Sequence, residues 1–233
     1  MVPNHEATVR KFFSQPSRYL HRRFGIRIRK DIIEGLTAAV DRRHVIDLGC
    51  GDGSLSRMFV DQAETVTLVD LAQPMLDLAR DALSAERRRK VRFHCGGFET
   101  LAGLTQEYDL VMLIGLLAHV PDVAAYLTTA ATKVIPGGHI LLQFGAANHP
   151  LIRLERWLGR ANHKLNEIEL PQIEEVLTNA GFVIVKLEKC NFQFPGFGRL
   201  PDGLLYRYEH LIRKTPLLSK MGADYFVLAQ KRK

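Results

Sequence analysis

The sequence predicts an α/β protein with a doubly wound, mostly parallel β-sheet and helices on both faces. Short apolar runs alternate with helix-like patterns along the 233 residues. This alternation is typical of parallel strands joined by crossover helices. The first apolar run leads into a glycine-rich turn and then a helical pattern, an arrangement that nucleotide-binding sheets use. Both observations favour the same fold class.

Seven strands are expected from the apolar runs, and the fifth is expected to start after a Pro-Gly-Gly turn. The predicted strands cover residues 44–48, 65–70, 91–95, 108–114, 138–144, 182–190 and 224–230. The helical patterns between and before them cover residues 30–40, 54–62, 74–86, 122–134 and 168–180. Residues 1–233 are therefore expected to form one domain.

Two segments lie outside the alternation. Residues 5–30 are basic and partly amphipathic, and residues 191–221 form an insert rich in aromatic residues, Gly and Pro. Long connections in compact domains are often functional lids, so the insert is interpreted either as a lid over a substrate or as a structural helix packed on the sheet.

Composition points to a cytoplasmic protein. Three cysteines without metal-type spacing favour a reducing compartment, and neither a signal peptide nor a run long enough to span a membrane is present. The net charge is +7, and residues 10–30 carry basic residues without an acidic one. Nucleic acid, an anionic membrane, an anionic substrate or a solvated helix face would each explain this excess.

The segment "VIDLGCGDG", residues 45–53, places an acidic residue before a glycine loop. Its spacing, Gly49-x-Gly51-x-Gly53, lacks the third glycine of a dinucleotide fingerprint and the Gly-Lys-Ser/Thr of a P-loop. Asp47 would repel a phosphate but attract a cation. S-adenosylmethionine (SAM) carries a sulfonium and an ammonium, so it fits this loop.

A second acidic residue, Asp70, ends the next predicted strand. A carboxylate there can accept hydrogen bonds from ribose hydroxyls. Its alternative role is the N-cap of the helix that follows.

The chain resembles the class I SAM-dependent methyltransferases, particularly those that act on small molecules. "VIDLGCGDG", "VDLAQPML", "YDLVMLIGLLAHVPD" and "KVIPGGHILLQF" resemble four ordered motifs of this family. The resemblance implies strand order 3-2-1-4-5-7-6 with the seventh strand antiparallel. It departs from the family at Gly97, where an Asp often holds the adenine amino group, so the Phe98 backbone N–H and apolar walls are expected to hold adenine instead.

The resemblance also implies which residues contact SAM. We expect cofactor contacts from Asp47, Gly49, Cys50, Gly51, Gly53, Asp70, Leu71, Met75, Gly97, Phe98, Ile114 and Gly115, and from Arg29 toward the methionine carboxylate. His119, just past the fourth strand, is the candidate catalytic base, with stabilisation of its loop or contact with SAM as the alternative. His149, His163 and His210 are interpreted as surface histidines in substrate-side segments, and Tyr19 and Tyr206 or Tyr208 as candidates to line the acceptor pocket.

The leading functional hypothesis is methyl transfer from SAM to a hydroxyl of a small biosynthetic metabolite, without a metal. The fourth-strand loop lacks both an Asn-Pro-Pro-Tyr-like element and an acidic cluster for a divalent cation, which disfavours base N-methylation and magnesium-dependent catalysis. An RNA methyltransferase, a methyltransferase acting on a lipid at a membrane surface, and a SAM-binding module without activity are the alternatives. The acceptor and the oligomeric state have no signal in the sequence.

Overall fold

The computed structural model describes residues 23–147, 149, 150, 153, 166, 168–192, 197 and 200–233. Its strands are β1 (His44–Leu48), β2 (Thr65–Asp70), β3 (Val91–Cys95), β4 (Tyr108–Ile114), β5 (Val134–Gly145), β6 (Phe182–Cys190) and β7 (Asp224–Lys231). Its α-helices are α2 (Arg23–Thr37), α3 (Gln73–Asp81), α4 (Ala85–Arg88), α5 (Phe98–Gly103), α6 (Val123–Thr132), α8 (Leu170–Asn179) and α9 (Asp202–Lys214). Three 3₁₀ turns complete the described elements: η2 (Ser56–Met58), η3 (Leu117–His119) and η5 (Leu218–Met221).

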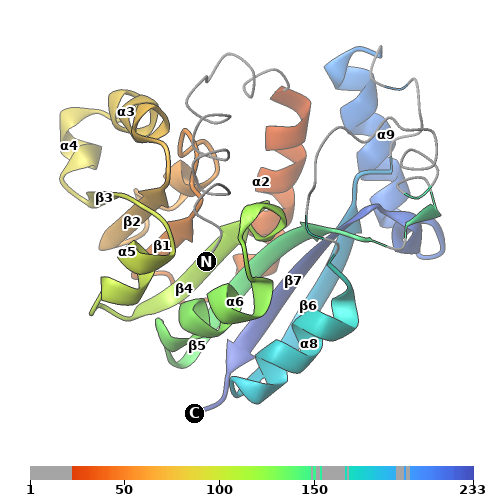
Figure 1. The fold of residues 1–233 in the computed structure, drawn as a ribbon. Coiled ribbons are helices and arrows are strands. Elements are labelled where there is room, and N and C mark those ends of the chain that lie inside the picture. The colour runs from red at the N-terminus through yellow and green to blue at the C-terminus, as the bar shows by residue number, and fades with distance from the viewer. Residues whose placement is uncertain are drawn as a thin grey trace.

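The strands form one sheet in the order β3-β2-β1-β4-β5-β7-β6 (Figure 1). β7 pairs antiparallel with β5 and β6, and the other pairs are parallel. The predicted strand order is therefore confirmed. The chain moves outward from β1 in both directions, so the carboxyl ends of β1 and β4 flank the switch point where ligands of such sheets bind.

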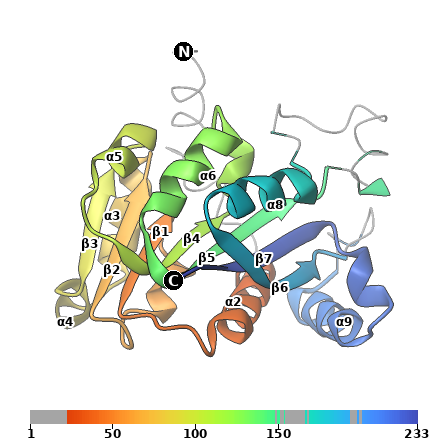
Figure 2. The ribbon, with the colours of Figure 1, turned by 90° about the horizontal axis from the view of Figure 1, so that it is seen from below.

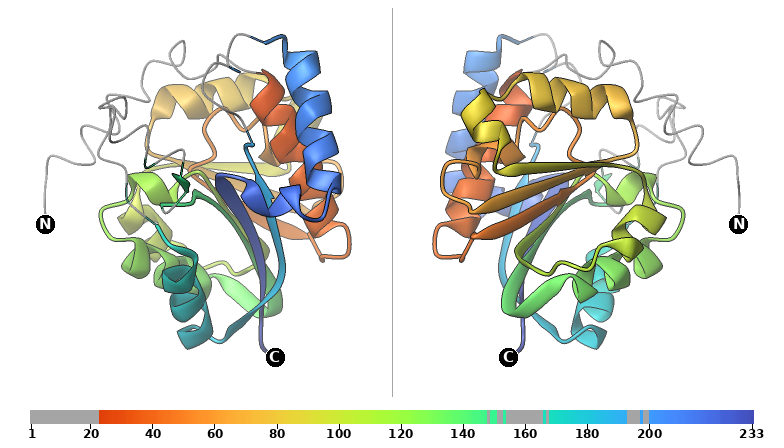
Figure 3. Two further views of the ribbon diagram at one scale, coloured as in Figure 1. Left: turned by 90° about the vertical axis from the view of Figure 1, so that its right-hand side faces the viewer. Right: turned by 90° about the vertical axis from the view of Figure 1, so that its left-hand side faces the viewer.

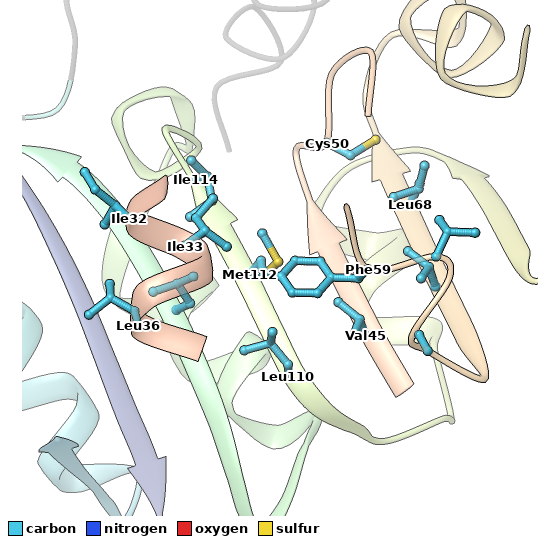
Figure 4. Packing of buried hydrophobic residues seen from close by; sticks show 14 of the residues in the cluster. Ile32, Ile33, Leu36, Val45, Cys50, Phe59, Leu68, Leu110, Met112 and Ile114 are labelled. Atoms are coloured by element: carbon cyan, nitrogen blue, oxygen red, sulfur yellow. The ribbon is translucent and has the colours of Figure 1, made fainter. Parts of the chain in front are cut away.

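Helices cover both faces of the sheet, as expected (Figure 2). One buried cluster joins the sheet to α2 and α3, and the other joins it to α5, α6 and α8. In the first cluster, Ile33 of α2 and Phe59 lie against the face that carries Met112 of β4 (Figure 4). Each of these side chains is at most 1% exposed, and burying one stabilises the fold by about 1.5–3 kcal/mol.

β5 starts four residues earlier than predicted. Tyr108 pairs with Val134, and a register shift then precedes the pairing of Leu110 with His139. The Pro-Gly-Gly sequence lies inside the strand as an irregularity, and Gly137 takes a φ of 80° there. A bulge of this kind lets a strand continue through residues that otherwise signal a turn.

The α-helix predicted over residues 54–62 is wrong, because the structure has only η2 with turns on either side. Ser54 Oγ donates to Asp52, and Ser56 Oγ donates to Asp47. Ser and Asp side chains that bond locally compete with helical hydrogen bonding. The prediction over 74–86 is also corrected: α3 ends at Asp81, and Ser84 caps a separate α4.

Helix α9 occupies the second half of the 191–221 insert and lies beside α2 (Figure 3). The Tyr206 hydroxyl donates to Asp31 over 2.6 Å, and the Arg27 guanidinium lies 3.8 Å from the Tyr206 ring centroid. The helical interpretation of the insert therefore holds for residues 202–214, although the helix packs mainly on α2. Residues 5–22, which include Tyr19, and 193–196 lie outside the described residues, as do His163 and residues 198 and 199.

Among the helices that the structure describes, none is long and apolar enough to cross a membrane.

Candidate active site

The glycine loop joins the end of β1 to η2. Gly49, Gly51 and Gly53 have φ angles of 74°, 55° and 65°, a region that favours glycine. A Cβ at Gly49 would lie 2.9 Å from the Leu116 side chain. The Gly49 and Cys50 amides both donate to the Val69 carbonyl, over 2.8 and 3.1 Å. The loop is thus held across the ends of β1 and β2 and against the segment that follows β4.

Asp47 lies beneath this loop and is only 2% exposed. The pKa of Asp47 is raised to about 7, mainly by burial and to a smaller extent by the nearby Asp70, against the opposing effect of the hydrogen bond from Ser56. A cation placed beside this carboxyl group would favour its ionised form. Ser56 was not predicted, although a buried acid needs a donor and Ser54 and Ser56 follow within a few residues.

Asp70 is the last residue of β2 and holds the glycine loop. Its carboxylate accepts from the amides of Gly51 and Ala72, each over 2.8 Å. Burial raises the pKa of Asp70, and these hydrogen bonds oppose the shift. The N-cap of α3 is Ala72, so the N-cap alternative for Asp70 is wrong. A carboxylate offers about four acceptor positions, which leaves room for ligand hydroxyls.

Four of the predicted contacts lie on the β2 and β3 side of the loop. Met75 of α3 is buried, and its methyl carbon is 3.4 Å from where a Cβ at Gly51 would stand. Gly97 is the N-cap of α5, which begins at Phe98. The Phe98 ring packs on Tyr126, with their centroids 5.8 Å apart. Leu71, between β2 and α3, completes this side.

The end of β4 forms the other side. Ile114 is buried, and Gly115, with a φ of 73°, donates its amide to the Gln143 carbonyl over 3.0 Å. Gln143 Oε1 is buried without a hydrogen-bond partner among the described residues and lies 3.3 Å from where a Cβ at Gly115 would stand. Gln143 was not predicted, but it is the one polar residue within the apolar run "ILLQF".

His119 ends η3 and is half-buried. Asn166 supports this turn: its amide donates to the Ala118 carbonyl over 3.1 Å, and its side chain donates to the carbonyls of Leu117 and Val120 over 3.0 and 2.5 Å. The sequence offers no signal for this contact, because Asn166 lies more than forty residues away. The turn therefore has a defined position at the end of β4.

Arg29 lies on α2 beside the start of β7. With Asp224, Glu209 and Cys190 it lines a cavity of about 190 Å³. Burial raises the pKa of Asp224 to about 6, and the positive charge of Arg29 opposes the shift. Arg29 is thus near carboxylates of its own chain, and its reach toward the methionine carboxylate of SAM stays a prediction.

The Cys50 side chain belongs to the buried core and its thiol donates to the Gly51 carbonyl, so any contact from this residue is expected through its backbone. Within the described ranges no group of three His, Cys, Asp or Glu side chains is placed to hold a metal ion.

The fold and the loop define a class I SAM-dependent methyltransferase, and comparisons with known proteins agree. A family model described as a methyltransferase domain matches residues 18–187. The chain is 33% identical over 150 residues to the ubiquinone biosynthesis O-methyltransferase of Idiomarina loihiensis, covering 59% of this chain and 60% of the relative. A relative of the same name from Hydrogenovibrio crunogenus is 36% identical over 103 residues, 44% of this chain and 42% of that one.

Among solved structures, the chain is similar to magnesium protoporphyrin IX methyltransferase of Synechocystis PCC 6803 with bound SAH. The TM-score is 0.69 at 17% identity, with 97% and 99% of the two chains covered. At this identity the likeness shows the fold alone. The chain belongs to the methyltransferase-domain family, whose cofactor is SAM. It matches three-fifths or less of the length of these two ubiquinone biosynthesis O-methyltransferases.

Proposed function

We propose that the protein transfers the methyl group of SAM to a hydroxyl of a small, largely apolar metabolite. The observation that carries this proposal is Asp47, a carboxyl group 2% exposed beneath a three-glycine loop and paired with Ser56. A cationic ligand would compensate its desolvation, whereas a phosphate would add to the penalty.

The remaining residues fit SAM by their chemistry. Asp70 keeps free acceptor positions suited to two ribose hydroxyls. The unpartnered Gln143 Oε1, beside Gly115, is suited to an ammonium group. Buried Met75 and the ring of Phe98 offer apolar walls for adenine. When bound, SAM supplies an activated methyl group on a positively charged sulfur.

The chain's own contribution is alignment and proton removal. The glycine loop, fixed by the Val69 carbonyl and Asp70, sets the orientation of the reacting centre, and such positioning accounts for much of the rate of a displacement. A hydroxyl acceptor also needs a base, and the sequence offers His119 as a candidate because of its position just past β4. The small-molecule assignment is supported by relatives named for ubiquinone biosynthesis.

The test uses SAM labelled in its methyl group, a set of phenols and catechols, and EDTA in the buffer. We expect a labelled methyl ether from at least one small acceptor, at a rate that added magnesium does not change. SAM bound without transfer to any acceptor would favour the binding-module alternative. Transfer to bulk RNA alone, with a steep salt dependence, would favour the RNA alternative.

A lipid acceptor at a membrane surface is the second candidate, and exposed apolar residues favour it. Leu211, Leu217 and Met221 on α9 and around η5 are 65%, 77% and 58% exposed. Lys214 and Lys220 lie among them, as in segments that bind anionic lipid surfaces. Flotation with vesicles containing anionic lipid tests this: the wild type should float, and a variant with Leu211→Ser and Leu217→Ser should remain at the bottom.

A further inference from the structure

A cavity of about 570 Å³ lies at the carboxyl edge of the sheet, where β5 and β6 end and β7 begins. Ala146, directly after β5, and Tyr225, near the start of β7, form part of its wall. The end of β5 is bonded to the end of β4 through the Gly115 amide and the Gln143 carbonyl. The cavity therefore shares the carboxyl edge of the sheet with the β4 end of the proposed SAM site. The volume is typical of small-molecule pockets.

The lining is apolar and aromatic, with two cations. Its apolar and aromatic members include Phe192, Tyr208, Ile212, Leu218, Met221 and Tyr225. Lys189 and Lys220 also line it, and Lys189 Nζ lies 4.3 Å from the Tyr225 ring centroid. Such walls favour a flat aromatic ring, and nearby ammonium groups stabilise an oxyanion that forms on it.

His149 lines this cavity, and one of its ring nitrogens has no hydrogen-bond partner in the part of the chain that the structure describes. Its Nε2 lies 3.0 Å from the Met221 carbonyl oxygen. A carbonyl only accepts, so Nε2 carries the hydrogen, and the neutral ring keeps its lone pair on Nδ1. Nδ1 is buried without a hydrogen-bond partner among the described residues. An unpaired buried acceptor is costly and calls for a donor from a ligand.

We propose that this cavity is the acceptor site, that it takes an aromatic compound with a free hydroxyl, and that His149 Nδ1 accepts the hydroxyl proton. This proposal rests on the proposed methyl transfer. It assigns a catalytic role to His149, which the sequence analysis interpreted as a surface histidine. His119 is then expected to contact SAM or to stabilise its loop, and not to act as the base.

The step balances without a metal or a redox partner. The acceptor oxygen forms a bond to the methyl carbon, and its proton passes to Nδ1. The electron pair of the broken carbon–sulfur bond stays on sulfur. The imidazolium keeps its Nε2 hydrogen bond to Met221 and later returns the proton to water.

The tautomer is tested without any ligand. The full chain is labelled with ¹⁵N-histidine, and the signals lost in His149→Gln identify His149. We expect those signals to report a neutral ring with the hydrogen on Nε2 at mildly alkaline pH. A ring with its hydrogen on Nδ1 would overturn the proposal.

The cavity is tested with 4-nitrocatechol, whose absorbance reports binding. Ile212→Trp should weaken binding by about tenfold or more, equal to about 1.4 kcal/mol, because it fills the cavity. His210→Gln is the control on the same helix. His210 stacks on Tyr206 and is not among the residues that line this cavity, so this variant should bind 4-nitrocatechol like the wild type. Equal binding by the wild type and a folded Ile212→Trp would overturn the assignment.

Turnover then tests the role of His149. With SAM, the wild type should methylate the bound 4-nitrocatechol, and His149→Gln should lower kcat by about 10²–10⁴-fold while SAM affinity is unchanged. A probe that binds the cavity but is not methylated by the wild type, or unchanged kcat in the variant, would overturn the proposal. Failure of the wild type to bind SAM would instead overturn the proposed function.

Discussion

Asp47 combines deep burial with a carboxyl group that titrates near neutrality. Burial raises its pKa to about 7, so the folded protein binds this proton more tightly than the unfolded chain does. The free protein therefore loses stability as the pH rises through the window from about 4 to 7. A bound cation would reverse this effect by favouring the ionised form.

SAM affinity should consequently rise with pH between about 5.5 and 7, by up to about tenfold per unit, because Asp47 must ionise beside the cation. Calorimetry across this range measures the effect. Asp47→Asn should lose most of the slope, with the remainder coming from Asp70. Asp77→Asn, whose side chain is 50% exposed, is the matched control. A slope unchanged in Asp47→Asn would show that the cation lies elsewhere.

Substitution of His119 is expected to affect SAM binding, whereas substitution of His149 is expected to affect turnover. Its turn is fixed by Asn166 at the end of β4, where the methionine end of SAM is expected. His119→Ala should weaken SAM binding several-fold and change turnover at saturating SAM by less than about tenfold. Steady-state kinetics with varied SAM measures both. A loss of about 10²–10⁴-fold in turnover with intact SAM affinity would make His119 the base instead.

At the scale of elements, α9 packs on α2 and lines the cavity that we propose as the acceptor site. Phe24 N donates to Asp202 over 3.2 Å, and Tyr206 donates to Asp31. α9 also faces the cavity through Tyr208 and Ile212. A ligand held in this cavity should reduce the opening of α9 from the sheet.

Limited trypsin digestion tests this relation. Cleavage after Arg207 and Lys214, both exposed on α9, should slow when SAM and 4-nitrocatechol are added, because local opening is required. Cleavage after the exposed Arg89, next to α4, serves as the internal control and should not change. Protection confined to the glycine loop would contradict a covering role for residues 191–221.

At the scale of the whole molecule, the sequence predicted the sheet well because its central strands are buried on both faces. β4 consists of seven consecutive buried residues, and such an apolar run predicts a strand even when its neighbouring strands are not known. The start of β5 was missed because Pro-Gly-Gly signals a turn locally, while pairing of Val134 with Tyr108 decides the outcome. Local patterns cannot show a bulge that a neighbouring strand stabilises.

In the candidate site, too, the features that are local in the sequence could be predicted, and those that depend on contacts between distant segments could not. The glycine loop directly follows β1, which contains Asp47, and Asp70 ends β2, so the chemistry of each can be read from its own strand and turn. The partner of His149 is Met221, 72 residues away, so no spacing rule could reveal its tautomer. Tyr208 lines the cavity that we propose as the acceptor site, and Tyr206 contacts α2. Which side chains face a ligand depends on how α9 packs.

The central claim is that SAM binds at the glycine loop with Asp70 at its ribose. Calorimetric titration of SAM into the wild type and Asp70→Ala tests it most directly, with thermal unfolding to confirm that the variant is folded. Removing the carboxylate should weaken binding by about 1–3 kcal/mol, because the ribose hydroxyls lose their acceptor. Equal affinities in the wild type and a folded Asp70→Ala would contradict this placement of the cofactor.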